Sequence, residues 1–321
     1  MGLAVPLYRH LFILFNPIQS NPNKGTIPMN TENQISELDN STDENTPKKK
    51  VTLGEHAALW LADNKTVKFK PWTGKAERLM SKVLHDGRKS MEGGKVCRRV
   101  TLYLQFMCTE IAGKQFWKRD DDGNYKECCS QAEREYHLRS MYQADVLTAY
   151  FLMRIAGVDP EYNCTYVSPL DIDGKRECKW VGNLEDLEFK NDPTDDLEFE
   201  YEFKSPVRIR GKECSKVILG PAPWALAEDL KILNPGAVNL KLIAASIVCV
   251  PDISTERGIP FDETDLDEVP KRELNELEDI IGKKHKGLDM EVEVWDPEAE
   301  EFFQSSINWM DPDFLGGSSQ S

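Results

Sequence analysis

Two strand-like segments in the second half of the chain each place a glutamate two residues before a lysine. They read Glu188-Phe189-Lys190 and Glu202-Phe203-Lys204, and Asp196 lies in the loop between them. Residues i and i+2 of a strand point to the same face, so each pair sets a carboxylate beside an ammonium group. Two carboxylates can hold a divalent cation while a lysine steadies the attacking water or a charged transition state.

This arrangement resembles the Asp…(Asp/Glu)-x-Lys pattern of metal-dependent nucleases over a short stretch of the chain. The resemblance implies that Asp196 and Glu202 would bind the metal and that Lys204 would act in catalysis. The opposing interpretation is an exposed acidic strand whose like charges prevent edge-to-edge aggregation. We keep the nuclease as the third functional hypothesis, behind two hypotheses without catalysis.

Other catalytic and metal-binding patterns are missing from the sequence. It has no GxGxxG, GxxxxGK[ST], HExxH or GxSxG motif. The eight cysteines form no CxxC pair and the five histidines lie far apart, so we expect no metal site, no cofactor and mostly reduced thiols.

A group of cations in the first half is the best candidate for binding. Residues 65–99 are rich in Lys and Arg, and aromatic residues such as Trp117 and Tyr125 follow closely. Such a face can neutralise phosphates of nucleic acid or of an anionic lipid surface, with bases stacking on the rings. The alternative is ordinary solubility, or docking onto the chain's own acidic half. The binding candidates are Lys75, Arg78, Lys82, Arg88, Lys89, Arg98 and Arg99.

Charge is divided unequally along the 321 residues, whose net charge is −15. Residues 56–160 hold eighteen basic against thirteen acidic side chains, whereas residues 161–321 hold seventeen against thirty-six. Bulk charge therefore argues against a general nucleic-acid binder, while the polarity favours electrostatic partners or association between copies of the chain.

The first residues have the composition of a disordered tail. Residues 16–55 are rich in Asn, Ser, Thr, Glu and Pro and have few large apolar side chains. Lys48, Lys49 and Lys50 at its end form a candidate nuclear signal. The longest apolar run, residues 242–250, is too short to span a bilayer, so we expect no transmembrane segment and an intracellular protein of the cytoplasm or nucleus.

The hydrophobic pattern changes from helical to strand-like near Pro160, which predicts an α+β fold. An N-terminal helical half precedes a mostly antiparallel sheet with a few peripheral helices. We expect helices over residues 74–86, 95–113, 130–156, 224–233, 272–282 and 298–309, and a central strand over 238–250. Hairpins are predicted around Asp120–Gly123, Asp173-Gly174 and Gly211-Lys212. The expected divisions are a disordered tail (1–52), a basic helical region (53–159), an acidic β-rich region (160–310) and a flexible tail (311–321).

The first functional hypothesis is a non-enzymatic structural or assembly protein that self-associates into homo-oligomers and binds partners through its basic helical face. Opposite charge at two ends permits head-to-tail contacts, which form layers or filaments when they do not close. The strand-rich stretch leading into Pro221-Ala222-Pro223-Trp224 resembles rhabdovirus matrix proteins over a handful of residues, which implies a viral matrix-type or other virion-associated protein. A nucleic-acid-binding module is the second hypothesis.

Overall fold

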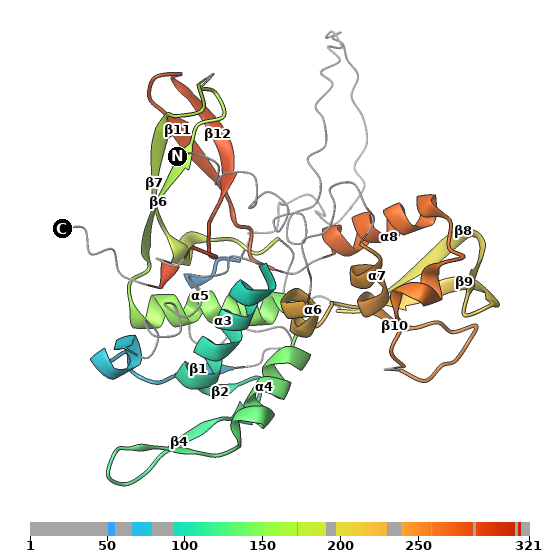
Figure 1. The fold of residues 1–321 in the computed structure, drawn as a ribbon, viewed down its shortest axis with the longest axis horizontal. Coiled ribbons are helices and arrows are strands. Elements are labelled where there is room, and N and C mark those ends of the chain that lie inside the picture. Colours follow the sequence, from blue (N-terminus) through green and yellow to red (C-terminus); the bar gives the residue numbers. More distant parts are fainter. Residues whose placement is uncertain are drawn as a thin grey trace, which may run out of the picture.

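A computed structural model describes residues 51–54, 66–78, 93–171, 173–190, 197–229, 239–257, 259–284, 287–311 and 314–315. It confirms the α+β class: the described residues form helices and several small sheets in which every strand pair is antiparallel (Figure 1). The predicted tail of residues 1–52, with Lys48, Lys49 and Lys50, lies almost wholly outside these residues.

The helices and strands are short, and most of the strands form hairpins. The helices are α3 (Gly93–Met107), α4 (Gln131–Ser140), α5 (Gln143–Gly157), α6 (Trp224–Asp229), α7 (Leu240–Ser246) and α8 (Lys271–Lys283). The strands are β1 (Val67–Phe69), β2 (Cys108–Ile111), β3 (Lys114–Gln115), β4 (Trp117–Arg119), β5 (Tyr125–Glu127), β6 (Glu161–Val167), β7 (Glu177–Asn183), β8 (Phe199–Ile209), β9 (Lys212–Leu219), β10 (Ile247–Cys249), β11 (Glu291–Asp296) and β12 (Glu301–Ser306).

Two hydrophobic cores hold the described residues together: the first takes residues from both sides of residue 160, and the second takes only residues that follow it. The first core surrounds α5 and also takes side chains from β7, β11 and β12. The second core lies between the β8–β9–β10 sheet and the helices α7 and α8. The hydrophobic period therefore changes near Pro160 because the secondary structure changes there. The first core contains residues from both sides of this position.

The predicted long helix over residues 130–156 is two helices. Its start is right, because Ser130 and Glu133 form the expected capping box. The helix breaks at Met141 and Tyr142, whose backbone is extended. The carbonyl of Met141 accepts a hydrogen bond from Trp224 N, and Tyr142 bridges to Pro223. Tertiary pairing with the segment before α6 thus overrides local helical preference.

The helix predicted over residues 95–113 ends early, at Met107. Cys108–Ile111 instead form β2, which pairs with β1 on one side and β3 on the other. Ala112 and Gly113 turn the chain with φ values of 48° and 79°, in the left-handed region that favours glycine.

Two further predictions of secondary structure are wrong. Residues 238–250 were expected as a strand, but Asn239 caps α7 through a side-chain bond from Leu242 N, and only Ile247–Cys249 are extended. Residues 298–309 were expected as a helix, but Glu301–Ser306 pair with β11 along their whole length. In both cases tertiary contacts decide between helix and strand for a short apolar run.

The three predicted hairpins are confirmed. Gly123 and Gly174 adopt positive φ in the turns between β4 and β5 and between β6 and β7. Arg210 and Gly211, with φ of 52° and 71°, connect β8 to β9 in a two-residue turn.

The C-terminal segment expected to be flexible contributes to the first core. Phe314 is fully buried, with its ring centroid 5.0 Å from that of Phe151 and 5.2 Å from that of Tyr162. Leu315 is buried as well. Flexibility as predicted for 311–321 therefore does not extend to these two residues.

The hairpins β6–β7 and β11–β12 project together from the body, away from the side on which the β4–β5 hairpin extends (Figure 1). Their inner faces carry Cys178, Val292, Val294 and Phe303, all buried in the first core. We call this pair of hairpins the projecting arm.

Candidate functional site

The predicted cationic face is only partly placed on the surface. Lys75 and Arg78 are exposed, in a helical segment over residues 74–78. Lys82, Arg88 and Lys89 lie outside the described residues. No common binding face of all seven cations can therefore be drawn from the described part of the chain.

Arg98 and Arg99 were expected to bind an external partner; the structure places Arg98 partly exposed at the surface and Arg99 in the interior. Arg98 Nη1 lies 2.5 Å from Glu135 Oε1 and 3.6 Å from Glu228 Oε2. Arg99 is only 7% exposed. The ion pairs of Arg98 join α3 to α4 and α6, while its side chain stays 36% exposed.

The residues of the nuclease hypothesis are not assembled among the described residues. Glu202 and Lys204 are both exposed on β8, and Lys204 forms an ion pair with Glu276 of α8. Asp196 lies outside the described residues. In the part of the chain that the structure describes, no group of three His, Cys, Asp or Glu side chains is arranged to hold a metal ion.

A compact cluster of cations and rings forms where β1, α3, the β4–β5 hairpin and α4 meet. The amine of Lys70 lies 3.2 Å from the ring centroid of Trp117, 4.5 Å from that of Phe106 and 5.5 Å from that of Tyr125. The guanidinium carbon of Arg134 lies 4.5 Å from the same Trp117 centroid. We call these five residues the cation–aromatic cluster.

Hydrogen bonds to backbone carbonyls hold two side chains of the cluster in place. Trp117 Nε1 donates to the carbonyl of Gln105 at 3.0 Å, and Arg134 Nη1 donates to the carbonyl of Cys129 at 2.6 Å. Arg134 Nη2 also contacts Glu127 Oε1 at 3.1 Å. Arg134 is buried and Lys70 is half-buried, so the two cations share a partly desolvated site.

Electrostatics in this cluster act on the amine of Lys70. Burial, and next to it the positive charge of Arg134, lower the pKa of Lys70 to about 8, while Glu127 and Cys108 oppose the shift. Burial disfavours the charged ammonium and a neighbouring cation repels it. Lys70 therefore changes charge close to neutral pH.

A second surface lies on the outer face of β11 and β12. Trp295 and Phe302 are cross-strand partners, 43% and 63% exposed, with ring centroids 4.8 Å apart. Glu291 and Glu293 share that exposed face. Residues 287–310 contain no Lys or Arg. We call residues 289–306 the acidic hairpin.

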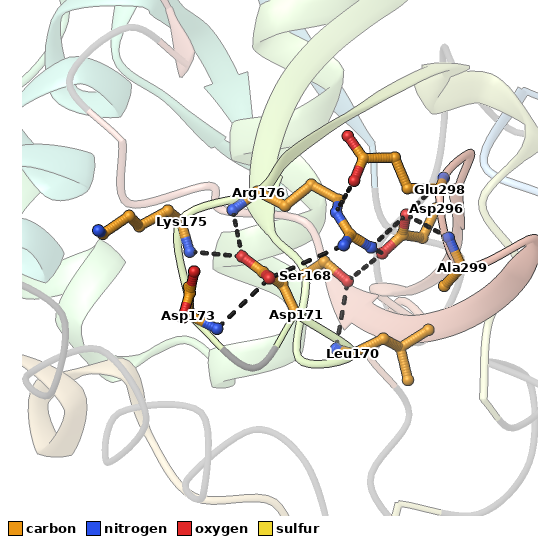
Figure 2. A network of polar contacts seen from close by, with 9 residues as sticks. All are labelled: Ser168, Leu170, Asp171, Asp173, Lys175, Arg176, Asp296, Glu298 and Ala299. Carbon is orange, nitrogen blue, oxygen red and sulfur yellow. Dashed lines mark hydrogen bonds and ion pairs between the residues drawn. The ribbon is translucent and has the colours of Figure 1, made fainter.

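A buried polar network fixes the acidic hairpin to the neighbouring β6–β7 hairpin (Figure 2). The carboxylate of Asp296 is fully buried and accepts hydrogen bonds from Ser168 Oγ and from Arg176 Nη1. It also accepts from the backbone N–H groups of Glu298 and Ala299, which closes the turn between β11 and β12.

These hydrogen bonds decide the charge state of Asp296. Burial alone would raise its pKa, but bonds from Ser168, from the backbone of Ala299 and Glu298, and from Arg176 together lower the pKa to about 2. Asp296 is therefore ionised at neutral pH, and the arm keeps a fixed charge beside the turn between β11 and β12.

Sequence reasoning missed the acidic hairpin because residues 298–309 were interpreted as a helix. The alternation Glu291-Val292-Glu293-Val294-Trp295 already indicates an exposed tryptophan on an acidic strand face. For the cation–aromatic cluster, the sequence placed Trp117 and Tyr125 near basic residues, but nothing in it pairs Lys70 with Trp117.

Comparison with known proteins assigns no relatives to this fold. No family model, no curated protein and no solved structure matches the chain. Within the described residues, no helix has the length and apolar character needed to cross a membrane.

Proposed function

We propose that this chain is a structural assembly protein that acts by binding, and that its acidic hairpin docks on a cationic surface of a second copy. The observation that carries the proposal is the exposed Trp295–Phe302 pair on a hairpin with no basic residue. Large aromatic side chains supply much of the binding energy at many interfaces, where they are enriched among the residues that contribute most.

Rigidity supports the same proposal. Asp296, one residue from Trp295, is locked by Ser168 and Arg176, so the ring pair stands on a fixed strand end. A preformed surface loses less conformational entropy on binding than a mobile one. The hairpin is therefore suited to repeated, identical contacts of the kind that an assembly needs.

Charge complementarity favours a second copy as the partner. The acidic hairpin carries exposed Glu291, Glu293, Glu298, Glu300 and Glu301 around the rings. Elsewhere the same chain exposes cations on the segment 74–78 and on the β4–β5 hairpin, on the other side of the body (Figure 1). The described exposed cations there are Lys75, Arg78, Lys118, Arg119 and Lys126, of which Lys126 pairs with Asp120, and the hairpin also exposes Asp121, Asp122 and Glu127.

A head-to-tail contact between such different surfaces is heterologous. It repeats without limit unless the rotation between copies closes a ring. The proposal thus predicts assemblies that grow with concentration.

The test is sedimentation of the full chain with Trp295 and Phe302 both changed to Ser. We expect self-association at least roughly thirtyfold weaker than for the wild type, because interface anchors typically contribute about 2 kcal/mol or more. The matched control is Val181→Ser, since Val181 is a similarly exposed apolar residue on β7 of the same arm. Equal association of wild type and the double variant would refute the role of the ring pair.

A further inference from the structure

The cation–aromatic cluster carries more positive charge than its surroundings balance. Lys70 and Arg134 both lie against the ring of Trp117, at 3.2 Å and 4.5 Å from its centroid. Within the described residues, the carboxylate that forms an ion pair in the cluster is Glu127, and its partner is Arg134. Glu127 is 56% exposed, so water screens its charge.

Lys70 is the cation that remains available to a ligand. Arg134 is tied to the carbonyl of Cys129 and to Glu127, and its side chain is buried. The amine of Lys70, in contrast, makes its described contacts with three rings and stays half-buried. Rings attract a cation but leave its hydrogen-bond donors without a negative partner.

An anion placed at Lys70 would relieve the repulsion between the two cations. It would form a charge-assisted bond to the amine, in a place where Arg134 adds a favourable field. The charged groups that act on Lys70 from the surrounding elements are Arg134 on α4, Glu127 on β5, Cys108 on β2, and Lys75 in the segment 74–78.

The rings indicate which kind of anion fits best. Phe106, Trp117 and Tyr125 are each partly exposed around Lys70, and the exposed Arg119 is the cross-strand neighbour of Tyr125 on the same face of the hairpin. Partly exposed rings among several cations are typical of surfaces that bind single-stranded nucleic acid, where bases stack and lysines contact phosphates. A carboxylate or an isolated phosphate would use the cations and leave the rings unused.

We propose that the cation–aromatic cluster is a binding site for single-stranded nucleic acid, with a phosphodiester at Lys70 and a base against Tyr125. This site is distinct from Arg98, which forms ion pairs with Glu135 and Glu228, from the buried Arg99, and from the acidic hairpin of the assembly contact. Arg119, on the same face of the hairpin as Tyr125, supplies a contact to a flanking phosphate.

The charge state of Lys70 gives the site a characteristic pH dependence. The anion favours the protonated amine, so binding is full below about pH 8 and weakens as pH rises through that value. We expect roughly a tenfold loss of affinity between about pH 7 and pH 9, because most of the free amine is neutral at the higher value.

The experiment measures fluorescence anisotropy of a labelled single-stranded oligonucleotide of about twelve nucleotides with the full chain, across this pH range and at two salt concentrations. Lys70→Gln should weaken binding roughly tenfold, remove the pH dependence and lower the salt slope by about one. Lys70→Arg should restore binding without the dependence on pH near 8, since arginine stays protonated.

The matched control is Lys212→Gln, which removes an exposed lysine at the start of β9. It should bind like wild type. Circular dichroism of each variant checks that the fold persists. Absence of binding to the oligonucleotide, or equal affinity of wild type and Lys70→Gln, overturns the proposal. Binding to a phosphorylated peptide but not to the oligonucleotide overturns it too, and assigns the cluster to a different partner.

Discussion

Arg176 Nη1 lies 2.9 Å from Oδ2 of Asp296, and this ion pair joins the two hairpins of the projecting arm at their turn ends. The carboxylate is fully buried, whereas the arginine is partly exposed and also reaches Glu298 through its Nε at 3.0 Å. One arginine therefore holds a buried and an exposed carboxylate, which provides a matched pair for mutation.

Asp296→Asn should destabilise the arm, and Glu298→Gln should not. The amide would leave Arg176 without its buried counter-charge and would disturb the bonds from Ser168 and the turn backbone. We expect a fall in Tm of roughly 5 °C or more for Asp296→Asn and little change for Glu298→Gln, measured by calorimetry. Equal melting of the two variants would show that the buried bond contributes nothing.

The low pKa of Asp296 predicts a contribution to acid stability. Its folded pKa of about 2 lies below the ordinary value of about 4 for an unfolded aspartate. The stabilisation is therefore complete above about pH 4 and is lost as pH falls toward 2. The free energy of unfolding by urea should fall less steeply across this range in Asp296→Asn than in wild type. Parallel curves for the two proteins would contradict the assignment.

Phe314→Ala tests whether the end of the chain belongs to the core. The ring is fully buried against Tyr150, Phe151 and Tyr162. Removing it should cost about 3–5 kcal/mol of the free energy of unfolding, by loss of burial and creation of a cavity.

Phe302→Ala is the matched control, because it makes the same change at an exposed ring. At high salt it should alter stability by less than about 1 kcal/mol. A small effect of Phe314→Ala would contradict its place in the core.

Arg99→Glu should lower the stability of the fold itself, independently of any binding partner. Arg99 is buried, so a glutamate there would place an unmatched negative charge in the first core. We expect Tm to fall by roughly 5 °C or more, while Lys75→Glu, at an exposed position, should melt close to wild type. Wild-type stability of Arg99→Glu would restore Arg99 as a surface cation.

Local sequence signals were sufficient for features whose conformation is determined by neighbouring residues in the sequence. Ser130 and Glu133 marked the start of α4, and Asp173-Gly174 and Gly211 marked turns, because capping and positive φ depend on residues close in sequence. The helix α8 followed from its amphipathic pattern alone.

Features that depend on contacts between residues far apart in the chain could not be predicted from the sequence. The break at Met141 depends on pairing with Trp224, about eighty residues away. The Lys70–Trp117 contact depends on the residue after β1 meeting β4, and helical spacing alone could not show that Arg99 is buried or that Arg98 forms ion pairs with α4 and α6. The exposure of Lys75 and Arg78 was predicted, and that of Arg99 was not.

The central claim is that copies of this chain associate through opposite charges. The most direct measurement is the molar mass of the full chain in solution by light scattering, at low and at high salt. The account predicts a mass well above one chain at low salt that rises with protein concentration and falls toward the 36.6 kDa of a single chain as salt screens the contact. A mass of one chain at both salt concentrations would contradict it.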